Sequence, residues 1–219
     1  MDGNRRWAKE RGKSSLEGHQ AGLDALKNIL ESYTVLREEF GIQHFIFYAF
    51  STENWNRSEK EVRHLLDLFE SSFEEIENAV ASNEHPPRIR FVGNRSAFSN
   101  SLQEKMHAIE AKTHENIGTV ALAVSYGGRD EIVRAVAKVC KKGGIVDEET
   151  ISSSLDTVDI PDPDLIIRTS GEQRLSNFLL WQAAYAELFF LKKFWPDIVV
   201  EDLKGVVEEY TKRQKRYGT

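Results

Sequence analysis

Residues 2–7, with the sequence DGNRRW, combine the residue types that bind a phosphate group. Glycine and asparagine tolerate tight turns that direct backbone N–H groups at an anion, and the two arginines supply positive charge for phosphate oxygens. Asp2 fits the same site if Mg²⁺ joins its carboxylate to the phosphate, because Mg²⁺ typically takes one or two carboxylates together with substrate phosphate oxygens. The segment by itself is also consistent with a plain N-terminal turn that carries solvated charges.

A second dense group of polar side chains, STENWNR at residues 51–57, follows the apolar run FIFYAF. Binding residues are common at the carboxyl end of a strand. The same residues could instead cap the helix that follows. Because Ser58 already supplies that cap, Ser51, Asn54 and Arg57 have no evident structural duty, and a functional role is as well supported as a structural one.

The third polar segment, RTSGEQRLSN at residues 168–177, follows the apolar stretch DLII. Its two arginines, with neighbouring serines and a glycine, indicate a second diphosphate cradle, and Asn177 is expected to open an apolar helix. The alternative is a solvated loop. Function is favoured because Arg168 directly follows a buried strand, where an unpaired charge would be costly.

Three further features are open between structure and function. Glu187 lies in the apolar run AAYAELFF, where a carboxylate needs either an arginine or a metal ion as partner. The paired glycines of SYGGRD, residues 125–130, permit a close approach of the backbone to a ligand or to a neighbouring strand. His19 could carry a proton, bond at the start of a helix or donate to a phosphate, and structural use is favoured from the residues alone.

The hydrophobic pattern predicts alternating helices and strands around these segments. Helical periodicity covers residues 18–40, 58–80, 101–113, 130–142 and 200–216, and apolar strands cover 45–50, 88–92, 119–125 and 164–169. The second helix begins with a capping box, Ser58-x-x-Glu61. This alternation predicts an α/β fold with a central, mostly parallel sheet flanked by helices. Ligands of such sheets bind beyond the carboxyl ends of the strands, where the polar segments should meet.

The composition sets further limits. With 219 residues, 40% of them hydrophobic and 29% charged, the chain is expected to form one domain. A net charge of −6 argues against a general binder of nucleic acid or anionic membrane, so phosphate chemistry must be local. The single cysteine, Cys140, excludes a disulfide framework and is expected to be buried. The longest apolar stretch carries Gln182 and Glu187 and is shorter than the ~20 residues of a membrane span, so the protein is expected to be soluble.

Taken together, these segments resemble the cis-prenyltransferase family, which includes undecaprenyl diphosphate synthase. The resemblance runs nearly end to end and is carried by MDGNRRWA at residues 1–8, Gly18-His19, YAFSTENWNR at 48–57, YGGR at 126–129 and RTSGEQRLSNFLLWQ at 168–182. It implies an enzyme that condenses isopentenyl diphosphate onto an allylic diphosphate with Mg²⁺ to make a cis-polyprenyl diphosphate, the precursor of a long-chain glycosyl carrier lipid. The alternative within the family is a non-catalytic subunit of a hetero-oligomeric enzyme, although such subunits usually lose the catalytic aspartate and several arginines.

The resemblance also implies a role for each site residue. The allylic diphosphate would lie on the turn from Asp2 to Arg6, assisted by His19 and Arg57, with Mg²⁺ between Asp2 and diphosphate oxygens. The residues expected to bind substrate in these segments are Gly3, Asn4, Arg5, Arg6, Trp7, His19, Ser51, Thr52, Glu53, Trp55 and Arg57. Isopentenyl diphosphate would be held by Arg168, Arg174 and Ser176. Ser51 and Asn54 would assist the condensation. Glu187 would serve the metal or the subunit contact, and Arg216 would reach the partner's active site in a homodimer.

Fold and location follow from the same resemblance. The family has an apolar product tunnel between the sheet and two helices, for which Ala49, Leu65 and Phe69 are candidate lining residues. Family members carry an apolar strand just before the Met-Asp-Gly-Asn motif, and the single catalytic domain at 1–219 begins at that Met. Either the start of the sequence is misplaced or trimmed, or the sheet lacks its usual first strand. We expect a cytoplasmic enzyme that binds no nucleic acid, with a peripheral membrane contact for product release left open.

Overall fold

The computed structural model describes residues 1–213. The elements in chain order are α1 (Asn4–Glu10), α2 (Ser15–Glu31), α3 (Tyr33–Phe40), β1 (His44–Ser51), η1 (Thr52–Asn56), α4 (Glu59–Ser71), α5 (Phe73–Ala81), β2 (Arg88–Val92), η2 (Arg95–Ala97), α6 (Asn100–Thr113), β3 (Thr119–Tyr126), α7 (Gly128–Lys141), α8 (Glu148–Ser152), β4 (Leu165–Arg168), η3 (Gln182–Tyr185), β5 (Glu187–Phe190), η4 (Trp195–Asp197) and α9 (Val200–Lys212). The η elements are short 3₁₀ helices. The expected alternation of helices and strands is confirmed.

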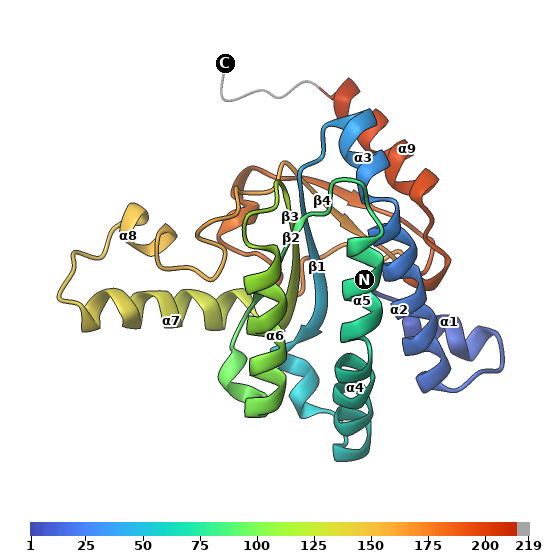
Figure 1. The fold of residues 1–219 in the computed structure, drawn as a ribbon, viewed down its shortest axis with the longest axis horizontal. Coiled ribbons are helices and arrows are strands. Elements are labelled where there is room, and N and C mark those ends of the chain that lie inside the picture. The colour runs from blue at the N-terminus through green and yellow to red at the C-terminus, as the bar shows by residue number, and fades with distance from the viewer. Residues whose placement is uncertain (214–219) are drawn as a thin grey trace.

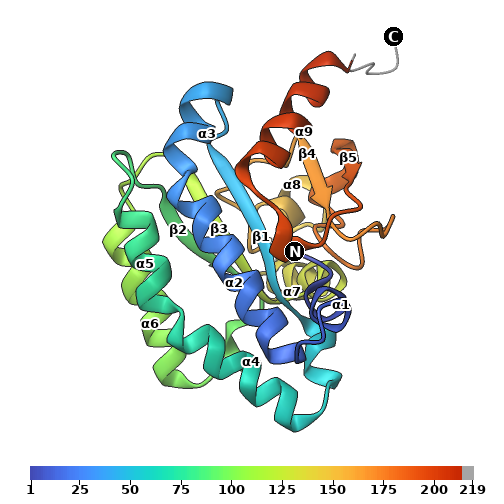
Figure 2. The same ribbon diagram turned by 90° about the vertical axis from the view of Figure 1, so that its right-hand side faces the viewer.

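The strands form two parallel sheets rather than one. A three-stranded sheet has the order β1-β3-β2, and β4 pairs with β5 in a separate two-stranded sheet. Within the described residues, no strand pairs with both sheets and joins them. Figure 1 shows the two sheets with the chain's N-terminus near them, and Figure 2 shows α2, α4, α5 and α6 on one side of the larger sheet and α7 on the other.

The central strand β3 contributes to apolar clusters on both faces of the larger sheet. All eight of its residues are buried, and its side chains alternate between two apolar clusters. Val120, Leu122 and Val124 join the larger cluster with residues of α2, α5 and α6, whereas Ala121 and Ala123 join a smaller cluster on the opposite face. A strand buried on both faces is continuously apolar, as the sequence predicted for this stretch.

Two expected helices are each broken in the middle by a serine. The helix predicted for residues 18–40 begins at Ser15 and breaks at Ser32, and the one predicted for 58–80 breaks at Ser72. The Ser32 hydroxyl donates to the Asn28 carbonyl at 2.9 Å, and the Ser72 hydroxyl donates to the Phe69 carbonyl at 2.7 Å. Serine hydroxyls that bond to helix carbonyls compete with the backbone ladder and bend helices.

The expectation that Asn177 opens a helix is wrong. Ser176, Asn177 and Leu179 all have positive φ, which a right-handed helix does not allow, and the chain instead enters η3 and then β5. The Glu187 amide donates to the Asp164 carbonyl at 2.9 Å, so pairing with β4 decides the conformation of this stretch. The expectation for Cys140 is also wrong, since its thiol lies on the exposed face of α7.

Candidate active site

The turn that carries Asp2 is held by residues distant in sequence. The Asp2 amide donates to Thr169 Oγ1 at 2.9 Å, the Thr169 hydroxyl donates to the Asp2 carbonyl at 2.9 Å, and the Trp195 amide donates to that carbonyl at 3.0 Å. Gly3 has φ +102, and a Cβ there would lie 2.6 Å from Phe194 Cδ1, so only glycine fits this turn. The turn is therefore fixed against the end of β4.

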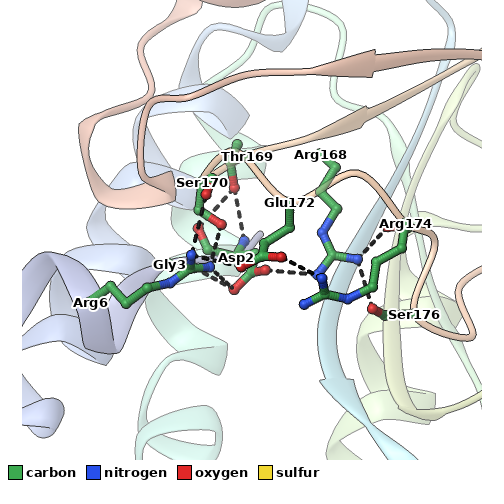
Figure 3. Close-up of polar contacts among 9 residues, drawn as sticks. All are labelled: Asp2, Gly3, Arg6, Arg168, Thr169, Ser170, Glu172, Arg174 and Ser176. Atoms are coloured by element: carbon green, nitrogen blue, oxygen red, sulfur yellow. Dashed lines mark hydrogen bonds and ion pairs between the residues drawn. The ribbon is translucent and has the colours of Figure 1, made fainter.

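The Asp2 carboxylate is the centre of a polar cluster that joins the N-terminal turn to the loop after β4 (Figure 3). Its Oδ2 accepts from Arg168 Nη2 at 2.8 Å, its Oδ1 accepts from the Gly3 amide at 2.6 Å, and Arg6 Nη2 lies 3.4 Å from Oδ1. Burial raises the pKa of Asp2, but the hydrogen bond and positive charge of Arg168, with Arg6, more than offset this, so the pKa lies below its ordinary value. Asp2 is ionised at neutral pH.

Arg168 and its neighbours form the second half of the cluster. Arg168 Nη1 donates to Ser176 Oγ at 2.8 Å and to the Arg174 carbonyl, so one guanidinium ties Asp2 to Ser176. Glu172 accepts from Arg6 at 3.0 Å and also pairs with Arg174. The arginines and serine of the predicted cradle therefore lie close together, and Arg168 links them to the N-terminal turn.

These residues lie at one end of a cavity of about 1410 Å³. Basic side chains gather at this end, namely Arg5, Arg6, Lys9, Lys13, Arg57, Arg168 and Arg174. Apolar residues make up much of the remaining lining, including Phe45 and Phe47 of β1, Ile167 of β4 and Leu203 of α9. The polar residues Gln43, His44, Asp162 and Asp164 also contribute to it. The cavity thus joins a basic end, suited to phosphate, with an apolar space between the two sheets. Local positive charge coexists with the net charge of −6, as expected.

Three buried polar atoms at the basic end have no hydrogen-bond partner within residues 1–213. They are Asn4 Oδ1, His19 Nε2 and Arg168 Nε, and all three residues line the cavity. Buried polar atoms are normally satisfied, so such a group indicates room for a polar ligand. Burial and the positive charge of Arg57 lower the pKa of His19 from 6.5 to about 4, so its imidazole is neutral at pH 7.

Gly18, just before His19, has a role in packing. A Cβ at this position would lie 2.3 Å from the Asn4 carbonyl oxygen and 2.9 Å from Ala8 Cβ, so glycine lets α1 and α2 approach closely. The resulting contact places His19 and the N-terminal turn beside the same cavity.

The loop after β1 contributes Ser51, Asn54 and Arg57 to the cavity. The expectation that these three have no structural duty is wrong. Asn54 Oδ1 accepts from the Ser51 amide at 3.0 Å and so caps η1, while Arg57 Nη1 donates to Glu61 Oε1 at 2.8 Å. Ser58 Oγ accepts from the Glu61 amide at 3.4 Å, so the predicted box has its serine half while the Glu61 carboxylate binds Arg57.

Four predicted substrate-binding residues do not line the cavity. Trp7 is buried and donates from Nε1 to Asp197 at 2.7 Å, and Trp55 donates to Ser125 Oγ at 2.9 Å and packs on Phe50. Both tryptophans therefore support the site through contacts with residues outside the cavity lining. Thr52 and Glu53 also lie outside the cavity lining, at the outer side of η1.

Glu187 lies apart from Asp2 within the described chain. In the β4–β5 register Glu187 pairs with Leu165, whereas Arg168, which binds Asp2, pairs with Phe190 at the other end of the strand. Arg213 Nη1 donates to Glu187 Oε2 at 2.7 Å, so an arginine is the partner that this carboxylate needs. Within the chain, Glu187 is not brought to the Asp2 cluster. Arg216 lies outside the described residues.

Two of the three candidate tunnel residues line the cavity and one does not. Ala49 and Leu65 line the cavity, whereas Phe69 packs against Phe73, Phe91 and Phe98 in the larger core. Phe69 therefore packs with the larger core and is not part of the cavity lining.

Several site residues could have been found in the sequence and were missed. Lys9 lies one helical turn after Arg5 on α1, so helical spacing predicts a shared basic face. Lys13, beyond the end of this helix, also lines the cavity. Thr169, which fixes Asp2, directly follows Arg168 at the strand end. The sequence predicts Asn177 only as a helix start. No local signal indicates its hydrogen bonds with Glu53 and the Arg129 amide.

Comparisons with known proteins agree with this site. A family model described as "Putative undecaprenyl diphosphate synthase" matches residues 1–218. The isoprenyl transferases of Treponema denticola and Thermotoga maritima are each 43% identical over 100% of this chain and 94% of their own length. The crystal structure of lavandulyl diphosphate synthase from Lavandula x intermedia, in complex with dimethylallyl diphosphate, has a TM-score of 0.90 and 34% identity, covering 100% of this chain and 95% of the other. That of a probable undecaprenyl diphosphate synthase from Campylobacter jejuni has a TM-score of 0.80 and 32% identity, covering 91% and 93%.

Proposed function

This chain belongs to the undecaprenyl diphosphate synthase family of prenyltransferases, and we propose that it condenses isopentenyl diphosphate onto an allylic diphosphate to make a cis-polyprenyl diphosphate. The observation that carries the proposal is a cavity with the Asp2–Arg168 cluster at its basic end and apolar residues along much of the rest. Such a cavity suits two diphosphates and a hydrocarbon chain.

The allylic diphosphate is proposed to bind beside the turn at residues 2–6, where Asn4, Arg5 and Arg6 line the cavity. His19 and Arg57 face the same space from α2 and the loop after β1. The buried, unsatisfied Nε2 of His19 supports a contact with a phosphate oxygen. A solved structure 34% identical to this chain holds dimethylallyl diphosphate, which supports an allylic diphosphate as ligand.

Isopentenyl diphosphate is proposed to bind at Arg168, Arg174 and Ser176. Arg168 is bonded to Asp2 and Ser176 and keeps an unsatisfied Nε, and Arg174 lines the cavity. Arginine suits this role because its planar donors match phosphate oxygens in pairs. The two subsites would then share the cavity across the Asp2–Arg168 bond.

In the reaction, the bond between the allylic carbon and the diphosphate oxygen breaks, and inorganic diphosphate leaves with the electron pair. The double bond of isopentenyl diphosphate forms the new carbon–carbon bond, and loss of a proton from the isopentenyl unit creates a cis double bond. Arginines stabilise the leaving diphosphate, and the apolar walls exclude water that would quench the allylic cation. Ser51 and Asn54, which line the cavity, are placed in this proposal to assist proton removal.

Asp2 fits a role as the protein ligand of Mg²⁺. No group of three or more metal-binding side chains occurs among the described residues, so a cage built from protein alone is not formed there. Mg²⁺ sites often use one or two carboxylates with substrate phosphates, which one ionised aspartate beside a diphosphate site would satisfy. When bound, the ion would neutralise charge on the leaving diphosphate. Glu187 would join such a site only from another subunit, given its bond to Arg213.

We further propose a homodimer and a long-chain product that serves as a glycosyl carrier lipid precursor. The lining residue Ala49 is small, which supports space for a long chain. Release of that product through a peripheral contact with a membrane is part of the proposal. Residues 1–213 contain no helix long and apolar enough to cross a membrane.

The test is incorporation of labelled isopentenyl diphosphate by the purified chain with farnesyl diphosphate and Mg²⁺. We expect label in the organic-soluble fraction, products with more than one added unit, and loss of activity on chelation of the metal. Asp2→Ala should lower kcat/KM by about a hundredfold or more, because it removes the carboxylate that organises both subsites. The exposed Asp67 on α4 lies outside the cavity lining, so Asp67→Ala is the matched control and should behave like the parent.

The proposal fails if no label enters the organic-soluble fraction and Asp2→Ala is indistinguishable from the parent. Activity that appears only after a second, different prenyltransferase subunit is added would favour the non-catalytic partner role. Sizing the labelled products on a gel gives the chain length.

A further inference from the structure

The paired glycines Gly127 and Gly128 lie between the two loops that the proposed function assigns to the two substrates. A Cβ on Gly127 would lie 2.5 Å from Thr52 Oγ1 in the loop after β1 and 2.6 Å from Asn177 Nδ2 in the loop after β4. A Cβ on Gly128 would lie 2.8 Å from Leu180 Cγ. Since real Cβ contacts are not this short, the YGGR turn brings three segments closer together than any side chain would permit.

Asn177 connects the same three segments by hydrogen bonds. Its Nδ2 donates to Glu53 Oε1 at 2.8 Å, and its Oδ1 accepts from the Arg129 amide at 2.9 Å at the start of α7. Its carbonyl accepts from the Gly128 amide at 2.7 Å. Both polar ends of the side chain and the carbonyl are therefore occupied, each by a contact far away in the sequence.

The residue type at position 177 is strongly constrained by these contacts. The backbone has φ +66, a left-handed conformation that asparagine tolerates better than most residues. The side chain must offer a donor to a carboxylate and an acceptor to an amide at the same time, which an aspartate of the same shape cannot do. The pKa of Glu53 agrees with this donor: burial raises it, but the bond from Asn177 helps to bring it below its ordinary value.

The position of this junction links it to the chemistry. Asn177 follows Ser176, which accepts from Arg168, and Glu53 precedes Asn54, which caps the turn at Ser51. A shift of the Asn177–Glu53 bond would therefore move groups of both loops relative to each other. Phe178, next in the chain, stacks on Tyr48 of β1 with ring centroids 4.7 Å apart and fixes the loop to the sheet.

We propose that Asn177, bonded to Glu53 across the Gly127–Gly128 turn, is a positioning residue that sets the separation between the allylic and the isopentenyl subsites. This inference rests on the proposed function. It assigns to the YGGR motif a close approach between loops rather than contact with a ligand, and it gives Glu53, which lies outside the cavity lining, a role through Asn177.

The central test is a swap of donor and acceptor. Asn177→Asp keeps the acceptor for the Arg129 amide but sets two carboxylates against each other, so we expect kcat to fall by about tenfold or more while the KM of each substrate changes less. Glu53→Gln keeps an acceptor for Asn177 and should lose less. In the double variant E53Q/N177D, the introduced glutamine can donate to the introduced aspartate, and kcat should return to within about threefold of the E53Q value.

Controls separate positioning from folding and charge. Asn28→Asp adds the same charge at an exposed position of α2 and should leave kcat unchanged. Gly127→Ala should lower kcat by a similar factor to Asn177→Asp, whereas Gly205→Ala, which meets no atom within 4 Å, should not. Thermal unfolding of each variant gives the folded fraction to which kcat is normalised.

The outcomes distinguish this inference from the proposed function. If the parent makes no product, the proposed function itself fails. If the parent is active and folded Asn177→Asp matches it in kcat, or E53Q/N177D is no better than N177D, the junction does not position the subsites and the inference is overturned. A loss confined to the KM of one substrate would also overturn it, because a direct binding role would then explain the effect.

Discussion

The loops after β1 and β4 supply the two halves of the proposed site, and they differ in how they are held. The loop after β1 has local contacts of its own, since the Ser51 amide bonds to Asn54 three residues on and Arg57 bonds to Glu61 four residues on. Trp55 and Glu53 in the same loop add long-range bonds, to Ser125 and from Asn177. The loop after β4 is held by contacts across most of the chain, from Asp2 to Arg168 and from Arg6 to Ser170, at separations of 166 and 164 residues.

Their backbones differ as well. No residue from Ser51 to Arg57 has positive φ, whereas Ser170, Ser176 and Asn177 in the other loop all do. Non-glycine residues in this conformation cost free energy and persist when surrounding contacts hold them. The backbone of the first loop is therefore compatible with local preference, whereas the backbone of the second is held by contacts such as those with the N-terminal turn.

The largest expected difference between the loops concerns their arginines. Arg168 bonds to Asp2, Ser176 and the Arg174 carbonyl, whereas Arg57 bonds to Glu61. Because a lysine cannot reproduce several directed bonds, Arg168→Lys should lower kcat/KM for isopentenyl diphosphate by about a hundredfold, and Arg57→Lys should lower kcat/KM for the allylic substrate by about tenfold or less. Steady-state kinetics with each substrate varied in turn measure both. Equal losses would contradict the contrast between the loops.

Backbone strain gives the next effect. Ser176 has φ +48, where a β-branched residue is a severe outlier, so Ser176→Val should lower the free energy of unfolding by about 1–3 kcal/mol. The matched change Thr52→Val, in the loop with ordinary φ, should cost about 0.5 kcal/mol or less. Urea unfolding followed by circular dichroism compares the two. A larger cost for Thr52→Val would mean that the positive φ of Ser176 does not decide how much stability a β-branched residue costs in these loops.

Loss of the local cap in the first loop should lower the free energy of unfolding by a smaller amount. Asn54→Ala leaves the Ser51 amide without its acceptor and should lower the free energy of unfolding by about 1 kcal/mol. Because the bond between Asn177 and Glu53 joins the two loops, the cost of Asn54→Ala should not add to that of Ser176→Val, and the double variant should differ from the sum by more than about 0.5 kcal/mol. Simple additivity in urea unfolding would show that the loops are independent in stability.

The pH dependence of stability gives a separate test of the first loop's surroundings. His19, which faces the first loop, has its pKa lowered from 6.5 to about 4, so it binds its proton more weakly in the folded than in the unfolded chain. Its contribution to stability is present above pH 6.5 and is lost as the pH falls from 6.5 through 4. The free energy of unfolding of the parent should therefore fall more steeply over this range than that of His19→Asn. Parallel curves from urea unfolding at several pH values would refute this.

Much of the molecule follows from local pattern. The apolar run at residues 119–125 predicts a buried strand, and β3 is buried along its whole length. The polar segments after β1 and β4 were expected at the carboxyl ends of parallel strands, and both contribute to one cavity. These predictions succeed because hydrophobic period and strand ends depend on neighbouring residues.

Local pattern did not predict which way the site residues face. Trp7 and Trp55 turn to the core, and β5 forms where a helix was expected, since pairing with β4 decides that stretch. Propensity is a weak signal once long-range contacts compete with it.

The sequence by itself determined that this chain has an α/β fold with phosphate-binding residue types at the ends of its strands. Only the tertiary structure decided that Asp2 and Arg168 form one cluster and that Asn177 bonds to Glu53 across the Gly127–Gly128 turn. The reason is physical. The Asp2–Arg168 and Asn177–Glu53 bonds join residues 166 and 124 positions apart, and a local pattern carries no information on such pairings.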